Sequence, residues 1–362
     1  MYKGNVLNFR KNLLIVFAAA ALLSVVSGCA TTEKSSWDPF QLVFPVPPEK
    51  PRIKYVGSLS TEKDVMSDTG SGITQTLFGA DSGEGLRKPF GVTTDEDGRV
   101  YVSDIGRVLI FDKAAKRLSI IGQNHPVINL VRPAGIFYDR KNSLLYVADP
   151  GLDRVLVYGK DGRLVLELGR NGELKDPGAV VVDSARNKVY VTNTKLHDVS
   201  VFDTKGGFIK NIGERGKEPG YFNFPTQLAI DGSGNIYVVD AGNFRIQVID
   251  PDGKYKMSLG AGVGMSQGYF ARPRAVAVSA EGYAFVVDST FEGVTTFDKL
   301  GRLLLVWGKG GIERGLLRVP SGIHIDEKGQ IYIVSQWNAR VDIFQLITYP
   351  EDKELLEPTQ KN

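Results

Sequence analysis

Histidine is the residue type in this 362-residue sequence whose clustering would most directly indicate catalysis. The chain has three histidines, His125, His197 and His324. A catalytic zinc ion is usually held by three protein ligands, with a fourth position open for water. His324 is therefore a weak candidate metal ligand, which needs loops to bring other ligands to it, and we otherwise expect it to line a channel or a core. The sequence predicts no cofactor, with zinc or calcium as the alternative.

Aspartate and arginine recur as pairs at short spacing, a second pattern that could bind a ligand. A pair that repeats in register is more simply explained as a device that shapes each loop. Exposed pairs of this kind contribute about 0–1 kcal/mol to stability. We therefore expect a structural role for these pairs. They are Asp240 with Arg245, Asp104 with Arg107, and Asp149 with Arg154, while Ser335 with Arg340 keeps the arginine.

Cys29 is the only cysteine, so the chain has neither a disulfide nor a haem-attachment Cys-x-x-Cys-His motif. A basic segment precedes an apolar run of 14 residues, from Leu13 to Val26, that would rise about 21 Å as a helix. This is short of the roughly 30 Å core of a membrane, so we expect a signal peptide over residues 1–28. Val26-Ser27-Gly28-Cys29 resembles the lipobox of bacterial lipoproteins.

That resemblance implies cleavage before Cys29, which then carries the lipid anchor, including palmitate. Ala30 follows the cysteine, and in enterobacterial-type sorting this resembles an outer-membrane destination. We expect a protein of the cell envelope, with a proline-rich tether over residues 29–51. Residues 29–362 hold 41 basic and 41 acidic residues, because Lys3, Arg10 and Lys11 account for the whole formal charge of +3. Without a broad positive field, nucleic acid is not an expected partner.

The segments that must position these residues are six copies of one unit. Tyrosine-valine pieces such as "YVVD" recur at spacings of 44 to 48 residues. A proline lies twelve or thirteen residues before each piece, and an apolar side chain lies three residues before each proline. The marker positions are Tyr101, Tyr146, Tyr190, Tyr237, Phe285 and Tyr332, with Pro89, Pro133, Pro177, Pro225, Pro273 and Pro320 before them.

Each unit reads as four short strands separated by Gly, Asn and Asp turns. Four antiparallel strands at such a period are typical of a β-propeller blade. The sixth unit lacks a clear outer strand, and "RIKYVGSL" at 52–59 could supply it, closing the ring and removing an exposed edge. The alternative is "LITYP" after Leu346. The blades are expected near 86–122, 130–169, 174–213, 221–260, 269–308 and 317–346 with 52–59, before a polar tail at 347–362.

The stretch "PGYFNFPTQLAIDGSGNIYVVDAGNFRIQVID" resembles an NHL repeat, with its strand-end aspartate and its Asn-x-Arg-Ile run. The third unit departs from the pattern, with Asn193 for the aspartate and Asp198 for the arginine. The resemblance implies an all-β, six-bladed propeller of four-stranded antiparallel blades. Some NHL-type propellers are zinc-dependent lyases, which implies a metal-dependent hydrolase or lyase as the alternative function.

The links between blades and the loops between second and third strands share one face of such a propeller, and longer loops are the usual site of recognition. The opposite face carries tight turns and is expected to leave little for binding. An insertion at 60–88 contains Ile73–Gly79, which could cap the channel. We expect a scaffold, more simply a binding protein than an enzyme, whose envelope protein or glycan partner contacts the loops. The candidate contact residues are Phe244, Phe291, Trp337, Arg245, Arg274 and Arg340.

Overall fold

A computed structural model describes residues 41–66, 84–123, 125–126 and 128–349. These residues lie in the compact unit Pro39–Asn362. The expected signal peptide, Cys29, the Ile73–Gly79 segment and the end of the tail lie outside the described residues. None of the helices in the described ranges has the length and apolar character needed to cross a membrane.

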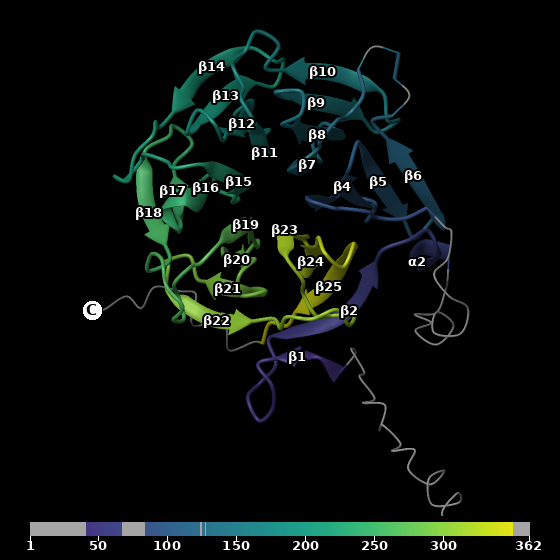
Figure 1. The fold of residues 1–362 in the computed structure, drawn as a ribbon, viewed down its shortest axis with the longest axis vertical. Helices are drawn as coiled ribbons and strands as arrows, with labels where there is room; N and C mark the ends of the chain where they lie inside the picture. Colours follow the sequence, from purple (N-terminus) through teal and green to yellow (C-terminus); the bar gives the residue numbers. More distant parts are fainter. Residues whose placement is uncertain (1–40, 67–83, 124, 127, 350–362) are drawn as a thin grey trace, which may run out of the picture. The chain divides into compact units, whose positions relative to one another are not determined.

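Six antiparallel sheets surround a central channel, which confirms the predicted all-β, six-bladed propeller (Figure 1). The described helical elements are short, α2 at Lys63–Met66 and the 3-10 turn η2 at Ala241–Asn243. Within each blade the first strand is innermost. Blade 1 has β3 (Val92–Thr94), β4 (Val100–Asp104), β5 (Arg107–Asp112) and β6 (Arg117–Ile121); blade 2 has β7 (Ile136–Asp139), β8 (Leu144–Asp149), β9 (Arg154–Gly159) and β10 (Leu164–Leu168); blade 3 has β11 (Pro177–Asp183), β12 (Lys188–Asn193), β13 (Asp198–Asp203) and β14 (Phe208–Ile212). Blade 4 has β15 (Pro225–Ile230), β16 (Ile236–Asp240), β17 (Arg245–Ile249) and β18 (Tyr255–Leu259); blade 5 has β19 (Pro273–Val278), β20 (Ala284–Asp288), β21 (Gly293–Phe297) and β22 (Leu303–Trp307); blade 6 has β23 (Pro320–Ile325), β24 (Gln330–Ser335), β25 (Arg340–Leu346) and β2 (Ile53–Leu59).

The apolar runs of the sequence become the second and third strands of each blade. In blade 4 every residue of β16 is buried, whereas β18 at the rim is mostly exposed or half-buried. Both faces of a middle strand are covered because neighbouring blades pack face to face. Ile236 and Val238 of blade 4 share a core cluster with Tyr190 and Val199 of blade 3. The core therefore lies between blades, which explains the nearly continuous hydrophobic runs.

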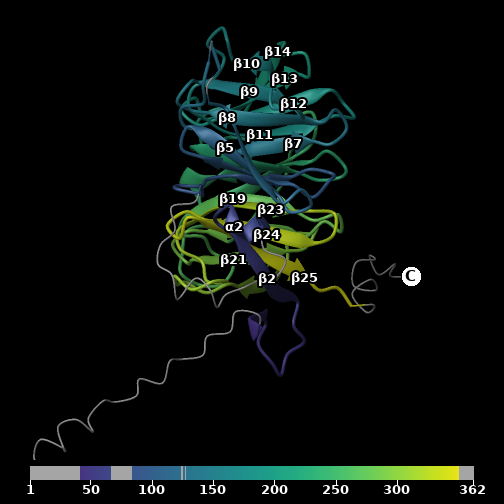
Figure 2. The same cartoon turned by 90° about the vertical axis from the view of Figure 1, so that its right-hand side faces the viewer.

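The N-terminal strand closes the ring, as predicted. β2 pairs with β25 from Ile53 opposite Leu346 to Leu59 opposite Val341, and Tyr55 packs edge-on against Phe344 at 5.6 Å. The alternative use of "LITYP" is wrong, because β25 ends at Leu346 and no strand follows it among the described residues. A further strand, β1 (Val43–Phe44), pairs with the outer edge of β2 within the stretch expected to be tether. Figure 2 shows β1 and β2 from the side.

The two faces of the ring differ as the topology requires. We call the face with the links and the second-to-third-strand loops the loop-rich face, and the other the turn-rich face. On the turn-rich face, the aspartates that follow the inner strands shape the turns. Asp231 accepts hydrogen bonds from the backbone N–H groups of Ser233 and Asn235, both at 2.9 Å. Gly234 in that turn has a φ of +86°, which favours glycine. This confirms the turn role expected for these aspartates.

Candidate functional site

The aspartate at the end of β16 is a buried hub of the loop-rich face. Asp240 accepts hydrogen bonds from the backbone N–H of Asn223 at 2.6 Å, Arg245 Nε at 2.8 Å and Gln247 Nε2 at 3.0 Å. Its side chain is fully buried and that of Arg245 is 17% exposed. The pair is structural, as expected, but it is buried rather than exposed. Hydrogen bonds to a buried charge are worth more than a surface ion pair.

The same carboxylate position fixes the start of most blades. Asp104 accepts a bond from the backbone N–H of Lys88 at 2.6 Å, Asp149 from Val131 at 2.7 Å, and Asp288 from Ala271 at 2.8 Å. These bonds join each second strand to the link that leads into its own blade. The aspartate therefore recurs because backbone N–H groups in the links would lack a hydrogen-bond acceptor without it.

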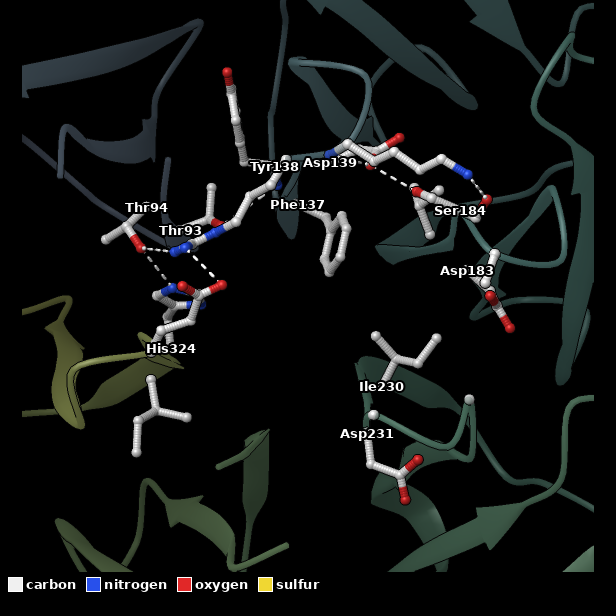
Figure 3. Close-up of a pocket in the computed structure, with 18 of the residues that line it drawn as sticks. Thr93, Thr94, Phe137, Tyr138, Asp139, Asp183, Ser184, Ile230, Asp231 and His324 are labelled. Carbon is white, nitrogen blue, oxygen red and sulfur yellow. Dashed lines mark hydrogen bonds and ion pairs between the residues drawn. The ribbon is translucent and has the colours of Figure 1, made fainter. Parts of the chain in front are cut away.

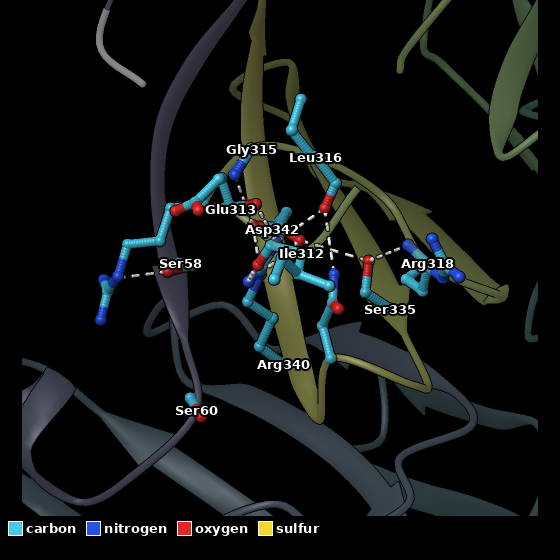
Figure 4. Close-up of polar contacts among 12 residues, drawn as sticks. Ser58, Ser60, Ile312, Glu313, Gly315, Leu316, Arg318, Ser335, Arg340 and Asp342 are labelled. Atoms are coloured by element: carbon cyan, nitrogen blue, oxygen red, sulfur yellow. Dashed lines mark hydrogen bonds and ion pairs between the residues drawn. The ribbon is translucent and has the colours of Figure 1, made fainter. Parts of the chain in front are cut away.

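The arginine partners vary more than the sequence suggested. Arg154 pairs with Glu167 at 2.8 Å, so the expected pair of Arg154 with Asp149 is wrong, and Arg340 pairs with Asp342 at 2.9 Å. Arg340 is 8% exposed and also donates to the carbonyl oxygens of Ile312 and Leu316 at 2.7 and 2.6 Å (Figure 4). Arg340 holds the link into blade 6 and is not available as a contact residue.

The three predicted aromatic residues do not form one exposed patch. Trp337, in the loop between β24 and β25, is 73% exposed. Phe244 is half-buried against the core cluster shared by blades 4 and 5, and Phe291 is half-buried in its loop. Phe244 also ends η2 in a left-handed conformation, with a φ of 55°. Of the three aromatic side chains, only Trp337 stands on the surface as predicted.

Other apolar side chains of the loop-rich face are more exposed than the two phenylalanines. Met265 is 78% exposed and Ile312 is 67% exposed, both in links between blades. Sequence reasoning missed these residues because it considered only three aromatic side chains of the second-to-third-strand loops. The signal was their place outside the strand pattern, in links and loops away from the repeat's core positions. The set comprises Ile105, Val131, Leu196, Phe224, Val263, Met265 and Ile312.

A cavity of about 360 Å³ occupies the channel at the turn-rich face (Figure 3). This corrects the expectation that the turn-rich face has little room for binding. Phe137 and Ile230 point into the space from inner strands, and side chains of the inner turns form its rim. The rim is joined by ion pairs and hydrogen bonds: Arg140 to Glu327 at 3.0 Å, Ser184 Oγ to Asp139 at 2.6 Å, and Lys141 Nζ to the Ser184 carbonyl at 3.1 Å.

His324 lies at this cavity, on β23, as expected of a channel-lining residue. Its Nε2 lies 2.9 Å from Thr94 Oγ1 on blade 1. Burial, with a smaller contribution from the nearby Arg140 guanidinium, lowers the pKa of His324 to about 3. The imidazole is therefore neutral at physiological pH, the form in which histidine binds metals.

The other two histidines do not join it. His197, in the loop after β12, accepts a hydrogen bond through Nδ1 from the Phe224 N–H at 3.1 Å. His125 accepts one through Nδ1 from the Ile128 N–H at 3.2 Å, in the link between blades 1 and 2. Within the described ranges, no cluster of three or more His, Cys, Asp or Glu side chains could hold a metal ion. The residues at His324 therefore do not match a zinc site of three protein ligands.

A serine motif escaped the sequence analysis. Gly264–Gly268 reads Gly-Met-Ser-Gln-Gly, which fits the Gly-x-Ser-x-Gly pattern of hydrolase nucleophiles. That pattern requires a turn from a strand into a helix. Here Ser266 lies in the link between β18 and β19, with no helix after it. The match therefore reflects the glycine-rich composition of the link, and Ser266 does not lie in a nucleophile elbow.

Comparison with known proteins agrees with this architecture. A family model described as a 6-bladed beta-propeller matches residues 171–293. The human NHL repeat-containing protein 3 is 25% identical over 177 residues, covering 43% of this chain and 50% of that protein. The chain spans half or less of the length of such curated relatives.

Two solved structures share the fold. A protein of unknown function from Bacteroides thetaiotaomicron has a TM-score of 0.59 and 17% identity, over 82% of this chain and 76% of that one. Virginiamycin B lyase from Staphylococcus aureus has a TM-score of 0.51 and 13% identity, over 72% of this chain and 95% of that one. At these identities the likeness concerns the fold alone. Together with the repeat pattern, the findings show a six-bladed β-propeller whose repeats are similar to those of NHL-repeat proteins.

Proposed function

We propose that this chain is a lipid-anchored protein of the cell envelope whose propeller binds a protein partner through its loop-rich face. The observation that carries the proposal is the set of exposed apolar side chains on that face, led by Met265 at 78% and Trp337 at 73%. Exposed apolar side chains on the face that carries the longer loops are typical of interaction surfaces. Trp and Met are also enriched at protein interfaces.

The rigidity of the surrounding structure supports this function. The buried carboxylates at the strand ends hold the links, so the exposed side chains project from a fixed frame. A surface that needs little ordering on binding loses less conformational entropy. A glycan is the other partner class compatible with the sequence. The anchor at Cys29 belongs to the same proposal and rests on the lipobox-like residues Val26 to Cys29.

Site-specific photo-crosslinking in living cells tests the binding surface. A photoreactive amino acid replaces Met265 or Trp337 on the loop-rich face. In control proteins it replaces Leu300, in a turn and 64% exposed, or Val165, on the rim and 56% exposed. We expect one protein adduct of the same mass from both loop positions and none from the controls. Adducts from the control positions alone, or from no position, would contradict the proposal.

The alternative, a metal-dependent hydrolase or lyase, rests on the channel cavity and the neutral His324. Elemental analysis of the full chain, purified without chelators, separates it from the binding protein. Stoichiometric zinc or calcium that is lost in His324→Ala would favour the enzyme. Loss of the metal with an unchanged circular dichroism spectrum would locate the ion in the channel.

A further inference from the structure

The mouth of the channel on the loop-rich face carries two arginines that have no acidic partner among the described residues. Arg274, the second residue of β19, is only partly exposed, and Arg272 two residues before it is exposed. Neither side chain forms an ion pair or a hydrogen bond with any residue of the described chain. The guanidinium of Arg274 lies over the ring of Phe90, 5.7 Å from its centroid. A partly buried charge without a counter-charge is costly unless something else supplies one.

The contact with Phe90 places the Arg274 guanidinium beside blade 1. The pairing of β19 with β20 is irregular between Pro273 and Ala275, so Arg274 stands outside the regular ladder. Blade 1 carries Phe90 at the position equivalent to Arg274, directly after the repeat's proline. The contact between Arg274 and Phe90 therefore links blade 5 to blade 1 at the channel mouth, although blade 6 lies between these two blades in the ring. Burial and the charge of Arg272 lower the pKa of the Arg274 guanidinium.

The exposed tryptophan belongs to the same sector of the mouth. The backbone N–H of Trp337 donates to the carbonyl oxygen of Arg318, at the start of blade 6, over 3.3 Å. The neighbouring Gln336 side chain donates to the Pro89 carbonyl of blade 1 at 3.4 Å. This loop therefore lies between the starts of blades 6 and 1. Lys88, just before Pro89, is exposed and likewise makes no ion pair within the described chain.

We propose that the channel mouth is an anion-binding site, in which Arg272, Arg274 and Lys88 receive the carboxylates of an acidic segment of the protein partner. The inference rests on the proposed function and deepens it. A planar guanidinium binds a carboxylate through two parallel hydrogen bonds, and Phe90 holds the plane of Arg274 in place. Trp337 supplies the apolar contact beside the charges, and Trp with Arg is the usual composition of an interface hot spot.

Phosphate is the other anionic chemistry, and the charges favour carboxylate. Two other arginines of the face are already neutralised, Arg132 by Asp176 at 2.7 Å and Arg318 by Glu292 at 3.6 Å. Residues 29–362 have no net charge in total. A polyphosphate backbone requires a broad positive field, whereas one or two carboxylates require only this small group of cations.

Fluorescence anisotropy with a labelled hexaglutamate peptide and the detergent-solubilised full chain tests the site. We expect saturable binding at low salt, and about tenfold weaker binding to Arg274→Gln and to Arg272→Gln. Arg163→Gln is the matched control, because Arg163 is 86% exposed on the turn-rich face. Arg274→Lys keeps the charge and should bind at an intermediate level. Near-UV circular dichroism verifies that each variant is folded.

No binding of hexaglutamate, or equal binding by the folded Arg272 and Arg274 variants, would overturn the inference. Tighter binding of a labelled hexauridylate than of hexaglutamate would assign the cations to phosphate and would also overturn it. The crosslinks from Met265 and Trp337 do not depend on this result. Crosslinking without acidic-peptide binding would leave the proposed function standing and remove only the acidic partner.

Discussion

At the residue scale, one repeated position shows how the blades adjust their charges. In blade 4 the carboxylate of Asp240 is matched by Arg245. Blade 3 has Asn193 there, and Asp198 takes the place of the arginine. Asp198 is 7% exposed and accepts a hydrogen bond from Ser200 Oγ at 3.4 Å, but no Lys or Arg of the described chain pairs with it. Burial raises its pKa to about 6.

We therefore predict that Asp198→Asn stabilises the propeller at pH 7. The folded pKa of about 6 lies above the unfolded value of 3.8, so folding is penalised where the unfolded carboxyl is ionised. The penalty is absent below pH 3.8, grows as the pH rises to 6, and is then constant at about 1–3 kcal/mol. Urea unfolding of both proteins at several pH values measures it. Asp161→Asn, at a side chain 59% exposed, is the matched control. A gain for Asp198→Asn that is equal at pH 4 and pH 8 would contradict the explanation.

At the element scale, the strand that closes the ring should control the stability of the whole propeller. Tyr55 of β2 is 1% exposed and packs in one cluster with Ile53, Trp307 and Phe344. This cluster joins blades 5 and 6 to the N-terminal strand. Because β2 is far from β25 in the sequence, its pairing requires closure of nearly the whole chain.

Tyr55→Ala should lower the free energy of unfolding by about 3–5 kcal/mol, the cost of a large cavity in a packed core. The adjacent Val56→Ala is the control, because Val56 is 37% exposed and should change stability by about 0.5 kcal/mol or less. Denaturant unfolding followed by tryptophan fluorescence measures both variants. Similar losses for the two variants would show that β2 does not close the core.

The closing strand, the six blades and the turn aspartates could be predicted because each depends on a local pattern that recurs. The fifth strand β1 could not, since two residues beside several prolines give no strand signal. The exposure of Met265 and the burial of Arg340 also escaped prediction. Both depend on how a link folds over its own blade, which periodicity does not describe. The channel cavity arises from six inner strands at once and has no linear motif.

At the scale of the whole molecule, the two faces divide the chemistry. The loop-rich face holds exposed apolar side chains and cations without an ion pair among the described residues, and the turn-rich face holds the channel cavity with His324. A membrane anchor would keep both faces in one compartment of the envelope while leaving the propeller free to meet a partner. The proposed anchoring residue, Cys29, lies outside the described residues, and its substitution tests the anchor.

Cys29→Ser should move the protein from the membrane to the soluble fraction without unfolding the propeller. The proposed acyl chains would add about 0.8 kcal/mol of membrane affinity for each buried methylene, and the serine variant cannot carry them. Labelled palmitate should enter the wild type and the control Ser27→Ala, but not Cys29→Ser. In an enterobacterial host, Ala30→Asp should shift the anchored protein from outer to inner membrane.

Cys29→Ser protein that stays in carbonate-washed membranes would mean that another segment, or a membrane partner of the loop-rich face, holds it there. Repeating the fractionation with Met265 and Trp337 also replaced by alanine would separate these two causes, because only a partner held by that face would release the protein.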